Sequence, residues 1–299
     1  MSGPQYMGPE ARDPRLRRPQ AAPYPQAAPY PQAAPLGPPA PLGPVGPVGP
    51  VAPARTGPTT VRRRRRDDIA KYALTALGAL GLAGLLRLIS ATADEGASFT
   101  AAVLLALIPL LVVLLTVWWI DRWEPEPPSV LLTAFLWGAG VATVVSLVVN
   151  TTASIAVANA TGLSDSGEIV STVVSAPIIE ETTKGLGVLI IFLLRRSRFN
   201  GAVDGIVYAA VVAAGFAFAE NILYFVRYSD EIVRTFIMRA IASPFAHVIF
   251  TACTGLAIGV GARMRSRSAW AWTTPIGLAG AIALHAFWNG VLAAAPALY

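Results

Sequence analysis

The run AVLLALIPLLVVLLTVWWI, residues 102–120, decides the fold of this chain. It holds no charged residue, and a helix of this length nearly crosses the roughly 30 Å of hydrocarbon in a lipid bilayer. Six other predominantly apolar stretches accompany it, and none alternates with the period of two that marks a barrel strand. We therefore predict an all-α, polytopic transmembrane bundle of about seven spanning helices. The helices are expected near residues 69–91, 99–120, 129–158, 169–194, 202–225, 237–262 and 269–294.

The composition agrees with a membrane protein and argues against nucleic acid as a partner. Of the 299 residues, 54% are hydrophobic and 13% are charged, whereas a soluble domain carries about 25% charged residues. The net charge is +6, but the arginines flank apolar runs, where basic residues set orientation and meet anionic lipid. We expect a multi-pass protein of the cell membrane, with its N-terminus in the cytoplasm and anionic lipid at the cytoplasmic face. The arginines concerned are Arg62 to Arg66, Arg195, Arg196, Arg198, Arg263, Arg265 and Arg267.

Residues 1–66 differ in composition from the rest of the chain. The unit Ala-Ala-Pro-Tyr-Pro-Gln recurs from Ala21, and Pro-Val-Gly repeats extend to Val51. Such Pro-rich sequence favours extended conformations and lacks the apolar content needed to fold. We predict a disordered cytoplasmic tail over residues 1–66 that ends in the basic run, followed by a transmembrane domain over residues 67–299.

Charged and polar side chains occur inside four of the predicted helices. A carboxylate at the centre of a spanning helix costs about 2.5–3.5 kcal/mol on insertion scales, so such residues are functional candidates. By helical rise, all of them lie between the midplane and the outer leaflet. A layer shared by four helices predicts one site, reached by water from the outside. The candidates are Glu180, Glu181 and Lys184 in the fourth helix, Glu220 and Asn221 in the fifth, His247 in the sixth, and His285 and Asn289 in the seventh.

Lys184 follows Glu180 by four residues and Glu181 by three, so its ammonium group can neutralise either carboxylate on the same helix face. Pro177 and Pro244 each precede a key polar group, and such prolines are tolerated where a chain lines a cavity. The alternative is a buried salt-bridge network that only fixes helix register. The number of polar groups at one depth favours a site, whereas Asp204 and Tyr208, near the inner end of their helix, are expected to form an interfacial cap.

Four short motifs follow one another in the second half of the chain. They are Ala176-Pro-Ile-Ile-Glu-Glu-Thr-Thr-Lys184, Phe216-Ala-Phe-Ala-Glu-Asn221, the isolated His247, and His285-Ala-Phe-Trp-Asn289. Together they resemble the PrsW family of intramembrane proteases, which belongs to a wider group with the CAAX prenyl-proteases and bacteriocin-immunity-type membrane proteins. The loop Glu124-Pro-Glu-Pro127 is also similar to that family, and the resemblance runs from about Trp119 to Asn289.

The resemblance implies a transmembrane protease domain that cleaves a single-span membrane protein, typically an anti-sigma factor cut on its extracytoplasmic side. It implies that Glu180 and Glu181 are the paired acids of the family, and that the other three motifs supply the remaining site residues. The wider group often has Phe-x-x-x-His where this chain has Phe216-x-x-x-Glu220. That departure leaves the use of a metal open.

Peptide hydrolysis needs an activated water, a polarised carbonyl and a proton donor for the leaving amine. We expect Glu181 to take the proton from water, and two routes supply the rest. In the metal route, His247, His285 and Glu220 hold Zn²⁺, a two-histidine, one-carboxylate set of the kind found in catalytic zinc sites. In the metal-free route, Glu181 and His247 activate water while His285 and Asn289 stabilise the oxyanion.

Two functions from other classes remain as alternatives. Buried Glu, Lys and His also build ion relays, so an ion-coupled transporter or channel is one of them. That class predicts inverted repeats, and no convincing repeat is found among the predicted helices. The second alternative is a non-catalytic membrane scaffold that keeps the bundle and binds a partner.

Overall fold

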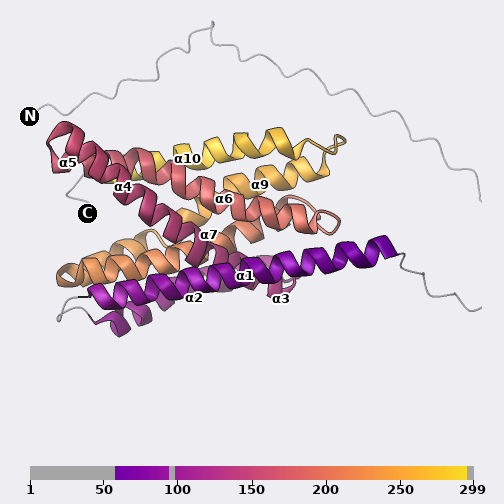
Figure 1. Cartoon of the computed structure of the whole chain (residues 1–299), viewed down its shortest axis with the longest axis horizontal. Coiled ribbons are helices and arrows are strands. Elements are labelled where there is room, and N and C mark those ends of the chain that lie inside the picture. Colours follow the sequence, from indigo (N-terminus) through magenta and orange to yellow (C-terminus); the bar gives the residue numbers. More distant parts are fainter. Residues whose placement is uncertain (1–57, 94–97, 295–299) are drawn as a thin grey trace, which may run out of the picture. The chain divides into compact units, whose positions relative to one another are not determined.

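The computed structural model describes residues 58–93 and 98–294, with side chains from Arg66 onward. Every regular element within these ranges is a helix, which confirms the predicted all-α bundle (Figure 1). Most of the predicted Pro-rich tail lies outside the described residues, whereas the basic run at its end belongs to the first helix. The elements are α1 (Pro58–Thr92), α2 (Phe99–Asp121), α3 (Pro128–Leu136), η1 (Trp137–Ala142), α4 (Thr143–Thr161), α5 (Ser164–Val170), η2 (Ser171–Ser175), α6 (Ala176–Arg195), α7 (Ala202–Arg227), η3 (Ser229–Glu231), α8 (Ile232–Phe236), η4 (Ile237–Ala242), α9 (Ala246–Arg263) and α10 (Trp270–Ala294).

Six helical stretches of the described residues are long and apolar enough to cross a membrane. The helix α6 has 20 residues and the length for a seventh crossing, but it carries Glu180, Glu181 and Lys184. These three charged groups, close together in one helix, distinguish α6 from the six stretches. The six apolar stretches are Arg66–Thr92, Phe99–Asp121, Pro128–Thr161, Ala202–Arg227, Ser229–Arg263 and Trp270–Ala294.

Three π-helical segments interrupt the predicted helices. The segment η1 joins α3 to α4 in one continuous span, and η2 joins α5 to α6. The third, η4, precedes a break at Ser243, whose φ of −136° and ψ of 37° leave the helical region. Pro244 explains the break, because a proline disfavours the α conformation in the residue before it. Single π turns inside helices occur frequently at functional sites.

Helix α7 packs closely against α9 and against η1, and we call these contacts the close-packed region. Gly205 of α7 and Gly255 of α9 face each other so closely that a Cβ on either would meet the carbonyl oxygen of the other. Gly138 of η1 is placed in the same way against the carbonyl of Val212. Small residues at such crossings let helix backbones approach, which increases the dispersion contacts between helices in a membrane.

A polar network ties the loop before α3 to the start of α7. The hydroxyl of Tyr208 donates a hydrogen bond to Glu126, and Nη2 of Arg195 lies 3.7 Å from Oε2 of the same carboxylate. Oδ2 of Asp204 accepts a hydrogen bond of 2.6 Å from the backbone N–H of Asn200. Asp204 and Tyr208 therefore have structural partners at this end of the bundle, away from Glu180, Glu181 and Lys184.

Candidate functional site

A cavity of about 870 Å³ extends between α4, α7, η4, α9 and α10. One wall carries polar side chains of α4, among them Ser146 and Asn150. The structure brings together in this cavity polar residues from all four helices that the sequence singled out. The predicted residues that line it are Glu180, Glu220, Asn221, His247, His285 and Asn289.

Glu181 lies behind the cavity wall and is fully enclosed, with 0% exposure. Its Oε1 lies 2.6 Å from Nζ of Lys184 and 3.0 Å from Nδ1 of His285, and its Oε2 accepts a 2.8 Å hydrogen bond from Thr251. Both oxygens therefore have partners, drawn from α6, α9 and α10. These surroundings suit a carboxylate that holds other side chains in place, and they differ from those expected of a base that meets water.

Glu180, the preceding residue, faces the cavity instead. Its Oε2 is buried and makes no hydrogen bond with the described residues. The basic atoms beside it are Nζ of Lys184 at 3.7 Å and Nε2 of His285 at 3.9 Å. A buried carboxylate oxygen without a hydrogen bond is costly, so this atom is placed to meet a ligand, a metal ion or a reacting water.

The ring of His247 lies between an acid and an ammonium group. Its Nε2 is 2.9 Å from Oε2 of Glu220, and its Nδ1 is 3.1 Å from Nζ of Lys184. An ammonium group can only donate, so Nδ1 accepts and the ring proton sits on Nε2, where it is donated to Glu220. The ammonium also lies 4.2 Å above the ring centre of Phe216, a favourable cation–π contact.

Arg239 of η4 is a site residue that the sequence reasoning missed. Its guanidinium contacts the carboxylate of Glu220, and its Nε donates a 2.6 Å hydrogen bond to Oδ1 of Asn221. The available signal was an arginine inside an otherwise apolar stretch before His247. Asn289, which the sequence placed at the oxyanion, donates a 2.9 Å hydrogen bond to the carbonyl of Thr172 in η2.

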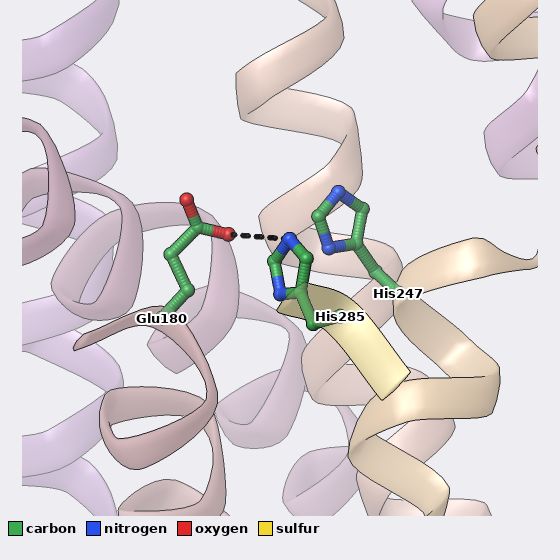
Figure 2. Close-up of side chains that lie close together, drawn as sticks. All are labelled: Glu180, His247 and His285. Carbon is green, nitrogen blue, oxygen red and sulfur yellow. Dashed lines mark ion pairs between the residues drawn. The ribbon is translucent and has the colours of Figure 1, made fainter. Parts of the chain in front are cut away.

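The side chains of Glu180, His247 and His285 form a group that could hold a metal ion (Figure 2). One ligand atom of each residue lies within 4.8 Å of those of the other two. The sequence predicted Glu220 in place of Glu180, but Glu220 is ion-paired with Arg239. Two imidazoles and a carboxylate are a common catalytic zinc set, and Oε2 of Glu180, which makes no hydrogen bond with the described residues, could serve as its carboxylate ligand. The residues present therefore fit a zinc ion.

The part of the chain that contains this cluster matches a known protein family. The family model described as PrsW family intramembrane metalloprotease matches residues 126–299, which include the four predicted motifs. The chain belongs to the PrsW family. The predicted resemblance is thereby confirmed, and the matched region begins within the loop Glu124-Pro-Glu-Pro127.

Two curated PrsW relatives show the extent of the similarity. Protease PrsW of Clostridioides difficile (strain 630) is 34% identical over 153 residues, which are 51% of this chain and 62% of the relative. Protease PrsW of Geobacillus kaustophilus (strain HTA426) is 30% identical over 139 residues, 46% of this chain and 57% of the relative. The chain thus spans about three fifths of the length of these PrsW relatives. No solved structure matches it.

Proposed function

We propose that this chain is an intramembrane endopeptidase that hydrolyses a peptide bond of a membrane-spanning protein inside the cavity. The observation that carries the proposal is the buried Oε2 of Glu180, which has no hydrogen bond and lies beside the imidazole of His285 on the cavity wall. Membership of the PrsW family and the names of the two relatives support the same activity.

The two histidines are held by different acids. His285 holds a proton on Nδ1 and donates it to Glu181, which leaves its Nε2 turned toward Glu180. His247 holds its proton on Nε2 against Glu220, which leaves Nδ1 as the lone-pair nitrogen. The ring of His285 thus has one nitrogen fixed by a carboxylate and the other available, as in metal-ligating histidines. Nδ1 of His247 accepts from Lys184, so it would bind zinc only after the ammonium has moved away.

We propose that Glu180, His247 and His285 hold a zinc ion in the active protein. When bound there, zinc would polarise a peptide carbonyl and acidify a water molecule. Glu180 then takes the ligand position that the sequence had given to Glu220, and Glu181 positions the ring of His285 while it neutralises Lys184. The amide of Asn221, which lines the cavity, is placed to donate to a substrate carbonyl.

The candidate substrates are single-span membrane proteins, among them anti-sigma factors of the kind that the family resemblance implied. We place the arginines that end α6 and α9 in the cytoplasm, where they meet anionic lipid. Arg196 after α6 donates to the backbone carbonyl of Arg267 after α9, so these basic segments lie at one end of the bundle. The cavity, near the other ends of these helices, then opens toward the outside.

The proposal is tested by incubating the purified chain in lipid nanodiscs with candidate single-span proteins and by identifying the products by mass spectrometry. Glu180→Gln keeps the size of the side chain, and it should lower cleavage at least a thousandfold. Glu168→Gln is the matched control, since Glu168 lies at the cavity edge, is 69% exposed and is paired with Arg227. Equal cleavage by wild type and Glu180→Gln would show that the hydrolytic assignment is wrong.

A further inference from the structure

Arg239 is the described arginine that reaches furthest into the site. Its side chain is 16% exposed and its guanidinium lies 4.0 Å above the ring centre of Tyr224. Nη2 contacts Oε2 of Glu220, while Nε donates to Oδ1 of Asn221. These two donors form one edge of the planar guanidinium, so a single side chain holds two successive residues of α7.

The contact with Glu220 continues to His247. Oε2 of Glu220 accepts from Arg239 and, at 2.9 Å, from Nε2 of His247. Arg239 therefore fixes the carboxylate of Glu220, and that carboxylate fixes Nε2 of His247. The other ring nitrogen, Nδ1, lies 3.1 Å from Nζ of Lys184. Without the guanidinium, the Glu220 side chain would gain rotamers in which it no longer meets Nε2, so the N–H of Nε2 would lose its fixed acceptor while Lys184 still faces Nδ1.

The contact with Asn221 fixes the amide in one of its two orientations. The Nε–H of an arginine can only donate, so the atom that faces it must be the carbonyl oxygen of the amide. The NH₂ group of Asn221 then points elsewhere, and Asn221 lies on the cavity wall. Arg239 thereby leaves the donors of the amide for a group inside the cavity.

We propose that Arg239 is a positioning residue of the site: it holds the Nε2 side of the His247 ring in place through Glu220 and turns the amide donors of Asn221 toward the substrate. The proposal rests on the proposed function for its catalytic consequence, but its geometric part can be measured without substrate or metal. A positive charge alone is insufficient under this proposal, because the two acceptors need two parallel donors. Lysine at this position would supply a point charge without the fork.

The direct test is nitrogen NMR of the metal-stripped chain, labelled with ¹⁵N-histidine, in nanodiscs. The chain has only two histidines, so a His285→Gln variant assigns the signals of His247. The wild type should show His247 protonated at Nε2 and unprotonated at Nδ1. Arg239→Gln and Arg239→Lys should both shift the Nε2 signal of His247, because Glu220 then no longer accepts from that nitrogen in one fixed geometry, while Lys184 keeps Nδ1 unprotonated. The matched control is Arg234→Gln, because Arg234 lies in the neighbouring α8, is 52% exposed and is paired with Glu231.

The kinetic test uses the same variants with a cleaved substrate. Arg239→Gln should lower kcat about 10- to 100-fold, the usual effect of losing a partner of a ligating histidine, and should weaken zinc in competition with a chromophoric chelator. Arg239→Lys should restore the melting temperature without restoring kcat, whereas a purely structural ion pair would be restored in both.

The outcomes separate this proposal from the proposed function. If the His247 signals of Arg239→Gln superimpose on those of the wild type, Arg239 does not position the ring, whatever the activity. If Arg239→Lys has wild-type His247 signals and wild-type kcat, the two parallel donors of the guanidinium are not needed and the proposal is overturned. If the signals change but the wild type cleaves no membrane protein, the positioning role stands and the endopeptidase assignment alone fails.

Discussion

The close-packed region and the cavity lie on the same helix, α7, and they are built from opposite kinds of residue. Gly205 brings α7 against α9 with no room for a Cβ. Further along, Glu220 and Asn221 line an open space and contact Arg239, a side chain of a separate segment. The comparison teaches that close helix packing and an open polar cavity can be built on one helix, because each occupies its own stretch of α7.

The largest effect is expected from the two adjacent acids of α6, which belong to different environments. Glu181→Gln would leave the buried ammonium of Lys184 without its partner at 2.6 Å. Breaking a buried ion pair in this way costs about 3–5 kcal/mol. Glu180→Gln should change the free energy of unfolding by less than about 1 kcal/mol, since its Oε2 makes no hydrogen bond. Denaturant unfolding in mixed micelles measures both, and equal losses would remove the distinction between them.

Zinc should stabilise the cavity side of the molecule by a smaller amount. A ligand at a hundred times its Kd adds about 2.7 kcal/mol to the free energy of unfolding, provided that it binds only the folded state. Removal of metal with a chelator should lower Tm, and added zinc should restore it. The double variant His247→Ala, His285→Ala is the control, and a zinc response that persists in it would place the ion elsewhere.

The next prediction compares the stability loss at a glycine in a helix–helix contact with that at a glycine that faces open space. Gly138→Ala would put a methyl group onto the carbonyl of Val212, and overpacking of this kind costs about 1–3 kcal/mol. Gly84→Ala is the matched control, because no atom lies within 4 Å of its Cβ position. In a helix this change should be neutral or stabilising by about 0.5–1 kcal/mol. Similar losses of Tm in both variants would contradict the close-packed region.

The smallest effect concerns a polar contact between α1 and α3. The hydroxyl groups of Thr75 and Thr133 lie 2.7 Å apart, and interhelical hydrogen bonds in membranes average about 0.6 kcal/mol. The loss should appear as the coupling energy in a double-mutant cycle of Thr75→Val and Thr133→Val. Thr116→Val is the control, since the exposed Thr116 bonds only to the carbonyl of Val112 in its own helix. A coupling energy of zero would mean that the contact adds nothing.

The helices and the meeting of their polar groups could be predicted from the sequence. Apolar runs fix the spans, and the shared depth of Glu220, His247 and His285 indicates a common site because a charge in hydrocarbon needs partners. These arguments concern length and depth along a helix. They locate a residue to within a turn and give its side-chain direction only for regular helices.

The rest of the site could not be predicted, because it depends on the direction in which each side chain points. Glu180 and Glu181 are adjacent in sequence and differ by about 100° around the helix axis, so depth could not tell which of them faces the cavity. Arg239 was missed because η4 and the break at Ser243 place it beside Glu220, an arrangement that regular helical periodicity does not give. The roles of the predicted site residues stay predictions until the variants above are measured.

The π-helical segment η2 immediately precedes α6 and sets the rotational phase of that helix. Each residue of an α-helix advances the chain by about 100° around the axis. A π turn holds one residue more than an α turn, so conversion of η2 to a regular helix at unchanged length would rotate α6 by about 100° and swing the carboxylate of Glu180 away from the imidazoles. A substitution within Ser171–Ser175 that had this effect would disrupt the site while every site residue remained intact in the sequence, and a search for motifs alone would count the altered chain as complete.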